Sequence, residues 1–164
     1  MRIVIIGCGK VGRTLVQYLS SEGHDVVVID SNARVLATLS DEEDVITVCG
    51  NGASYVIQRE AGVQHADLVI AVTPSDELNI LSCLVARKLS GAKTIARVRN
   101  PDYSAQLVLL RDELGLSMTV NPEHAAASEI ARMLRAPEGT IKRRMWQARK
   151  ELRSMLSEEA ISHA

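Results

Sequence analysis

Phenylalanine is absent from this chain of 164 residues, and aromatic residues make up only 2% of it. Hydrophobic residues nevertheless amount to 46%, so the core must be built from valine, isoleucine, leucine, alanine and methionine. Aliphatic runs of this kind are typical of parallel strands that are buried on both faces of a sheet. The composition therefore favours an α/β domain with one full core.

Three further absences narrow the class of protein. A formal net charge of −1 provides no overall attraction to nucleic acid or to an anionic membrane. No apolar stretch approaches the ~20 residues that a membrane-spanning helix needs. The amino-terminal residues enter a strand directly and lack a signal-peptide pattern. Together these features predict a cytoplasmic protein.

Cysteine and histidine are few and scattered. The three cysteines, Cys8, Cys49 and Cys83, are odd in number and show no C-x-x-C spacing, which argues against a disulfide framework. The four histidines lack the spacing of metal ligands. We therefore expect neither a metal site nor a set of catalytic residues.

A glycine-rich segment follows the first hydrophobic run. Residues 7–12 read Gly-Cys-Gly-Lys-Val-Gly. Gly7 permits a tight turn, Gly9 lets the backbone approach a pyrophosphate, and Gly12 lets the next helix pack close to the sheet. That helix offers unpaired N–H groups to phosphate, and Asp30 lies 18 residues beyond Gly12, where a ribose-binding acid is expected. The pattern predicts a dinucleotide site; a turn used only for packing would leave Asp30 without a purpose.

Strand and helix signals alternate along the chain. We expect strands over residues 3–6, 26–29, 45–49, 68–72, 93–98 and 117–120. We expect helices over residues 11–19, 33–39, a short stretch ending near 61, 76–89, 101–114 and 122–135. Ser31 is expected to cap the second helix. This alternation predicts a Rossmann-like, doubly wound parallel sheet of order 3-2-1-4-5-6, followed by a C-terminal helical extension.

That strand order places the binding crevice between strands 1 and 4. The loop with Thr73 and Pro74 then lies opposite the glycine turn, and Thr73 is either a donor to the second half of a dinucleotide or an ordinary strand-end residue. Alternation puts Arg97 and Arg99 on one face of strand 5. Because an unpaired buried arginine is costly, we expect Arg97 to contact phosphate and Arg99 to contact phosphate or form a surface or dimer salt bridge.

Several segments together point to one family. They are residues 7–12, 28–30, 50–54, 66–73, 75–79, 95–101 and 121–123. On these segments, residues 1–136 resemble the nucleotide-binding half of the RCK domain (also called KTN). Within that family they are similar to the N-terminal domain of the Trk-type potassium-uptake regulatory subunits of bacteria.

The resemblance implies a cytoplasmic sensor, not an enzyme, peripheral to the inner face of the cell membrane. It would bind NAD(H), with ATP or ADP as the alternative, form a homo-oligomer (a dimer or larger), and control a membrane-embedded potassium transporter subunit. The implied contacts are Gly7, Cys8, Gly9, Lys10, Val11 and Gly12 around the pyrophosphate, Asp30 at the ribose, Asn51 near the adenine, Thr73 and Pro74 on the far side, and Arg97 at phosphate.

The chemistry of the motif agrees with two parts of this expectation. Asp30 would repel a 2′-phosphate, so NADP is disfavoured. The turn does not match G-x-x-x-x-G-K-[ST], which excludes a Walker phosphate loop. The choice between NAD and ATP stays open, because the same ribose and phosphate contacts serve both.

The last part of the chain departs from the family pattern. Residues 137–164 are expected to form a basic amphipathic helical tail, and residues 132–153 hold eight basic residues against two acidic ones. Residues 138–156 weakly resemble the end of a sigma-factor region 4 helix-turn-helix. The tail is therefore a packing or dimerisation helix, a DNA contact of an NAD-responsive regulator, or a segment without a role of its own.

For the chain as a whole, a small NAD-dependent oxidoreductase is the remaining alternative to a regulatory subunit.

Overall fold

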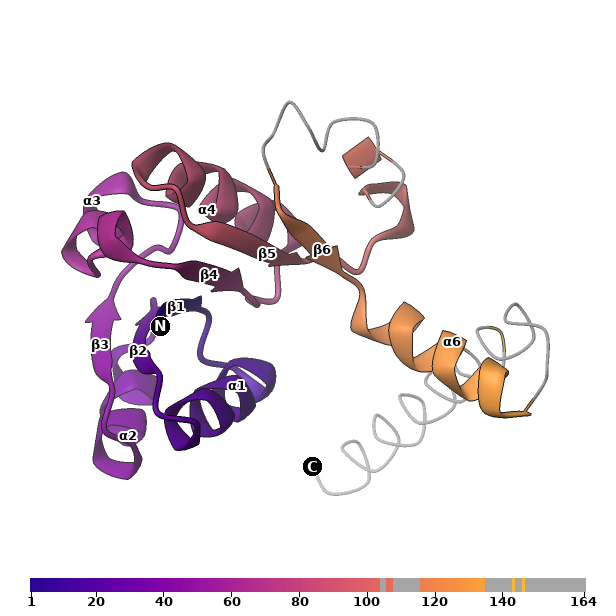
Figure 1. The fold of residues 1–164 in the computed structure, drawn as a ribbon, viewed down its shortest axis with the longest axis horizontal. Coiled ribbons are helices and arrows are strands. Elements are labelled where there is room, and N and C mark those ends of the chain that lie inside the picture. Colours follow the sequence, from indigo (N-terminus) through magenta and orange to yellow (C-terminus); the bar gives the residue numbers. More distant parts are fainter. Residues whose placement is uncertain (104–105, 108–115, 135–142, 144–145, 147–164) are drawn as a thin grey trace, which may run out of the picture. The chain divides into compact units, whose positions relative to one another are not determined.

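The computed structural model describes residues 1–103, 106–107, 116–134, 143 and 146. Its strands are β1 (Arg2–Ile6), β2 (Asp25–Asp30), β3 (Ile46–Cys49), β4 (Leu68–Ala71), β5 (Lys93–Arg97) and β6 (Met118–Val120). They form one six-stranded sheet of order β3-β2-β1-β4-β5-β6 (Figure 1). Every neighbouring pair of strands is parallel. The predicted sheet type and strand order are confirmed.

The helices follow the strands in alternation. They are α1 (Lys10–Ser21), α2 (Ala33–Glu42), α3 (Tyr55–Glu60), the 3-10 helix η1 (Val63–His65), α4 (Asp76–Leu89) and α6 (Pro122–Leu134). Residues 1–120 form one compact unit, and α6 belongs to a second unit of residues 121–164. Most of the expected helix over 101–114 and of the basic tail over 137–164 falls outside the described residues. The boundary placed at residue 136 therefore stays a prediction.

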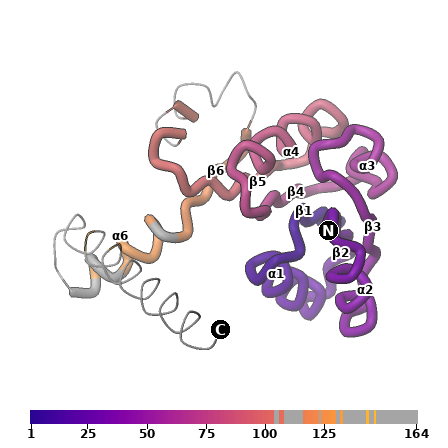
Figure 2. The backbone as a smooth tube through the Cα atoms, turned by 180° about the vertical axis from the view of Figure 1, so that it is seen from behind, coloured from indigo at the N-terminus to yellow at the C-terminus, as the bar shows by residue number. Residues whose placement is uncertain are grey.

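The core has two layers, one on each face of the sheet. Ile5 of β1 packs in one cluster with Val16 of α1 and Leu36 of α2. The next residue, Ile6, packs in the other cluster with Cys83 of α4. Figures 1 and 2 show α1 and α2 on one face of the sheet and α3 and α4 on the other. Both faces of β1 are thus buried, which explains why its residues 3–6 are all aliphatic.

The start of α2 differs in one residue from the expectation. Asn32, not Ser31, caps the helix, and its Oδ1 accepts the backbone N–H groups of Arg34 at 3.1 Å and Val35 at 3.4 Å. The reason is the helix boundary: α2 begins at Ala33, so the capping position is the residue directly before it. The expected cap at Ser31 was wrong by one position.

The two ends of α4 carry side chains of opposite charge. Asp76 and Glu77 lie in its first turn, and Arg87 and Lys88 lie in its last. This order complements the helix dipole. In the described part of the chain, no helix combines the length and the apolar character needed to cross a bilayer.

Candidate functional site

The glycine turn joins the carboxyl ends of three strands. Gly7 follows β1 with a φ of +103°, and its N–H donates to the carbonyl of Ile29 at 2.8 Å. A Cβ at this position would lie 2.9 Å from the backbone nitrogen of Thr73. Both the positive φ and the close approach require glycine. The turn therefore brings the ends of β1, β2 and β4 to one point, as the motif predicts.

Gly12 and Gly9 have different surroundings. A Cβ on Gly12 would lie 1.9 Å from the carbonyl oxygen of Gly7, which confirms that α1 packs closely on the turn. A Cβ on Gly9 would meet nothing within 4 Å. Gly9 precedes α1, and in this fully described segment the helix start has neither a side-chain cap nor an acidic residue in its first turn. The positive end of the helix dipole therefore faces an open loop.

Asp30 at the end of β2 holds this loop in place. One carboxylate oxygen accepts the N–H of Cys8 at 2.6 Å, and the other accepts the N–H of Asn32 at 2.8 Å. Hydrogen bonds to a charged carboxylate are among the stronger ones in proteins. Each oxygen can still accept a further hydrogen bond from a ligand hydroxyl. The carboxylate is therefore held in place and still able to bind a ligand.

Cys8 forms an apolar part of the loop. Its side chain is buried, and that burial raises the pKa of the thiol above its ordinary value, with Arg13 opposing the shift and Asp30 adding to it. A raised pKa keeps the thiol protonated at neutral pH. Cys8 is thus suited to packing against a ligand and unsuited to nucleophilic attack.

A cleft of about 580 Å³ opens at the carboxyl ends of these strands. Of the predicted site residues it brings together Gly7, Cys8, Gly9, Asp30, Asn51, Thr73 and Pro74. Sequence reasoning did not predict the other lining residues, which are Ile6, Ile29, Ser31, Asn32, Val35, Gly50, Gly52, Ser75 and Leu78. Some of these, such as Ser31 and Ser75, are sequence neighbours of predicted residues, a signal that could have found them.

Four predicted residues do not line the cleft. Gly12 is buried beneath the turn, Lys10 and Val11 are exposed on the first turn of α1, and Arg97 is half-buried at the end of β5. Gly12 acts through packing. The phosphate contacts expected of Lys10, Val11 and Arg97 stay predictions.

One wall of the cleft is the turn after β3. Asn51 Oδ1 accepts the N–H of Ala53 at 2.9 Å, which closes the turn. A Cβ on Gly52 would lie 2.1 Å from Ile6 Cγ2. The fully buried Gln58 donates from Nε2 to the carbonyls of Gly52 at 2.7 Å and Ser82 at 2.9 Å. This wall is therefore fastened to both β1 and α4.

The opposite wall is the loop after β4. The hydroxyl of Thr73 donates to Asn79 Oδ1 at 2.7 Å, and the Thr73 N–H donates to the same oxygen at 2.8 Å. The hydroxyl proton is thus directed into the protein, while the oxygen can still accept. The role of Thr73 as a donor to a ligand stays a prediction.

Charge is sparse among the described residues that line the cleft. Of these residues, Asp30 alone carries a charge. A phosphate in the cleft would therefore be held by backbone N–H groups and the α1 dipole, and not by a lining lysine or arginine.

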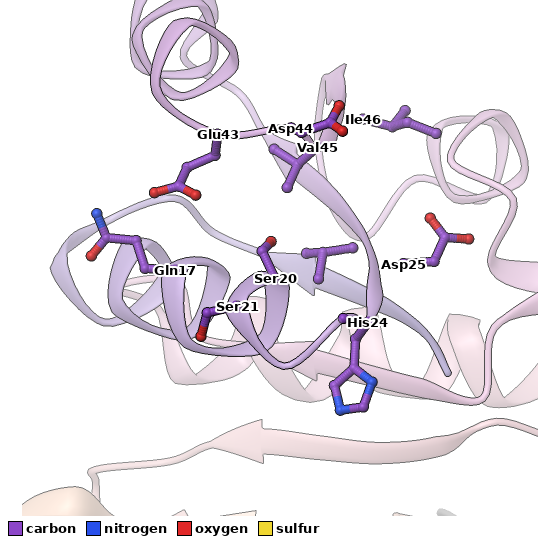
Figure 3. Close-up of a pocket in the computed structure, with 11 residues that line it drawn as sticks. Gln17, Ser20, Ser21, His24, Asp25, Glu43, Asp44, Val45 and Ile46 are labelled. Carbon is purple, nitrogen blue, oxygen red and sulfur yellow. The ribbon is translucent and has the colours of Figure 1, made fainter.

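A second hollow, of about 730 Å³, lies where β2 and β3 begin. Figure 3 shows Gln17, Ser20 and Ser21 of α1 on one side of it and the segment 43–46 on the other. Its lining includes the carboxylates of Asp25, Glu43 and Asp44, which would repel an anion. Ligands of open α/β sheets bind at the carboxyl ends of the strands, so the smaller cleft is the better candidate.

Comparison with known sequences agrees with this geometry. Residues 3–122 match the TrkA-N domain family. The chain belongs to that family. Its TrkA-N domain covers the whole cleft, since the residues that line the cleft lie between Ile6 and Leu78.

Relatives of this TrkA-N protein carry potassium-uptake names. The Trk system potassium uptake protein TrkA homolog of Methanothermobacter thermautotrophicus is 37% identical over 138 residues, which are 84% of this chain and 62% of that protein. Trk system potassium uptake protein TrkA of Haemophilus influenzae is 36% identical over 140 residues, 84% of this chain and 31% of that protein. The chain thus spans less than two thirds of the first relative and less than one third of the second.

Solved structures share the TrkA-N fold. The TrkA-N domain of the inner membrane protein ybaL from Escherichia coli superposes with a TM-score of 0.72 at 25% identity, covering 81% of this chain and 96% of that one. The GsuK channel bound to NAD superposes with a TM-score of 0.66 at 27% identity, covering 77% and 22%. GsuK bound to ADP gives a TM-score of 0.65 at 27% identity, covering 77% and 32%.

Proposed function

We propose that the cleft binds an adenine nucleotide, NAD(H) first and ATP or ADP as the alternative. The observation that carries the proposal is the uncapped start of α1 beside a fixed carboxylate: the helix has no side-chain cap, and Asp30 Oδ2 is held by the N–H of Cys8 at 2.6 Å. Backbone amides suit a diphosphate, and the carboxylate suits the ribose hydroxyls. The GsuK structures with NAD and with ADP support this class of ligand.

The charge of the cleft favours NAD(H) over ATP. ATP carries more negative charge than NAD(H), whose two phosphates form a single esterified diphosphate. Because the described cleft contributes the negative charge of Asp30 and no lining cation, the more highly charged ligand gains less. The 2′-phosphate of NADP would approach Asp30 directly and is disfavoured.

We infer a sensing role for this site. No histidine, lysine or arginine is among the described residues that line the cleft, so the site offers little general acid–base chemistry. The relatives are potassium uptake proteins by name. The chain then acts without catalysis, at the cytoplasmic face of the cell membrane, as a homo-oligomeric regulator of a membrane-embedded potassium transporter subunit.

Thermal stabilisation by a panel of nucleotides tests the binding proposal. NADH, NAD, ADP, ATP and NADPH are each titrated, and a true ligand at 100 times its dissociation constant should stabilise the fold by about 2.7 kcal/mol. We expect NADH or NAD to bind best and NADPH worst. If none of the five stabilises the protein, the proposed function is wrong.

Asp30→Ala tests the site itself. Hydrogen bonds to a charged group contribute about 1.5–3 kcal/mol, so the affinity for NADH should fall by roughly 10- to 150-fold. Asp25→Ala is the matched control, because Asp25 begins the same strand and is exposed at its opposite end. Unchanged NADH affinity in Asp30→Ala would show that the cleft is not the site.

A further inference from the structure

Parts of two segments that mark the family lie outside the lining of the cleft. Asp76 and Asn79, from the segment 75–79, do not line it, yet both are buried, with 7% and 0% of their surface exposed. Residues 97–100, at the end of β5, also stay outside its lining. Hydrogen bonds connect these two segments with each other and with the wall of the cleft at Thr73 and Pro74.

Asn79 joins two strand ends through a single amide. Its Oδ1 accepts both the N–H and the hydroxyl of Thr73, at 2.8 and 2.7 Å. Its Nδ2 donates to the carbonyl of Thr73 at 3.1 Å and to the carbonyl of Arg97 at 2.9 Å. The amide therefore uses both of its hydrogens and accepts twice. Any displacement of Thr73 changes the geometry of the bond to β5.

Asp76 makes the second connection. Its Oδ2 accepts the backbone N–H groups of Arg99 and Asn100, both at 2.8 Å. Its Oδ1 lies 3.6 Å from Nε of Arg99, and the guanidinium of Arg99 also donates to the carbonyl of Pro74, a residue of the cleft wall. Ser75, and not Asp76, caps α4, so the Asp76 carboxylate is left to join the start of this helix to residues 99 and 100.

We propose that the first turn of α4 relays the occupancy of the cleft to residues 97–100, with Asp76 and Asn79 as positioning residues. A ligand that contacts Thr73, Pro74 or Ser75 holds this turn in place. The amides of Arg99 and Asn100 exchange with solvent only after their hydrogen bonds to Asp76 break. Ligand binding must therefore slow their opening. The relay rests on the proposed function, since it needs a nucleotide in the cleft.

Hydrogen exchange of single amides in the full chain, followed by NMR, measures the relay. NADH is the probe, or ADP if only ADP binds. Saturation of the unmodified protein should slow exchange at Arg99 and Asn100 by roughly 5- to 150-fold, the range of typical coupling between sites. Asp76→Asn keeps the size of the side chain but replaces the charged acceptor of the two amides by a neutral one, which weakens both hydrogen bonds. It should retain nucleotide protection at Gly9 while losing most of it at Arg99 and Asn100.

Glu77→Gln is the matched control. Glu77 lies in the same turn and loses the same charge, but its carboxylate bonds to Ser75 and Tyr103 and not to the two reporting amides. We expect Glu77→Gln to keep the nucleotide effect at Arg99 and Asn100. Asn79→Asp, which removes the donor to Arg97, should weaken it.

Two results overturn the relay and leave the proposed function standing. One is a nucleotide that protects Gly9 but not Arg99 and Asn100 in the unmodified protein. The other is full protection at these two amides in Asp76→Asn. The first result is measured on the unmodified protein alone, so the relay can be disproved even if the Asp76→Asn variant fails to fold. A complete lack of nucleotide binding would sink both.

Discussion

At the scale of single residues, Gly9 and Gly12 have opposite requirements within one loop. A methyl group on Gly12 would collide with the carbonyl of Gly7 at 1.9 Å, while one on Gly9 would enter open space. The fold therefore requires glycine at position 12. Gly9 instead leaves open space for a ligand.

Gly12→Ala should destabilise the protein, because α1 must move away from the turn to accept the methyl group. Overpacking of this kind costs about 1–3 kcal/mol. Gly9→Ala should change the free energy of unfolding by less than about 0.5 kcal/mol but weaken NADH binding by about tenfold or more. Urea denaturation and calorimetric titration measure the two effects. A stable Gly12→Ala protein would contradict the observed packing.

At the scale of elements, the start of α4 combines a helix cap with the cleft wall. Ser75 Oγ accepts the N–H of Leu78 at 3.1 Å and donates to Glu77 at 2.7 Å. Ser54 occupies the corresponding position before α3 but forms no cap hydrogen bond with its side chain. Serine-to-alanine substitution can therefore be compared at a capping serine whose side chain forms the cap hydrogen bond and at one whose side chain does not.

Ser75→Ala should lower the free energy of unfolding by about 1 kcal/mol, the usual value of a serine cap. Ser54→Ala should change it by less than about 0.5 kcal/mol. Urea unfolding under identical conditions measures both. Equal losses in the two variants would show that the hydroxyl of Ser75 does not stabilise α4.

At the scale of the whole molecule, the cleft belongs to one compact unit. All of its lining residues lie between Ile6 and Leu78, within the unit of residues 1–120. Its lining residues come from β1 and β2, from the segments that follow β1, β2, β3 and β4, and from the starts of α2 and α4. Residues 121–164 form a second unit, and the described residues of that unit contribute no lining residue.

A chain that ends at Val120 should therefore bind NADH with a dissociation constant within about threefold of the full chain, a difference of about 0.65 kcal/mol. Circular dichroism checks that the shortened chain folds, and calorimetric titration measures its affinity. A folded fragment that has lost NADH binding would show that residues 121–164 contribute to the site.

The sequence by itself determined the fold class, the strand order and the core of the site. Aliphatic strands alternating with amphipathic helices allow few arrangements other than a doubly wound parallel sheet. The glycine turn and Asp30 are recognisable because each has a local steric or electrostatic cause. Such causes depend on residues close in sequence, so no coordinates are needed to recognise them.

Only the tertiary structure decided where the side chains of distant segments meet. That Gln58 fastens Gly52, and that Asp76 holds the amides of Arg99 and Asn100, depends on the packing of α3 and α4 against the sheet. These contacts join residues 6 to 24 positions apart, and no periodicity in the sequence marks which polar group meets which.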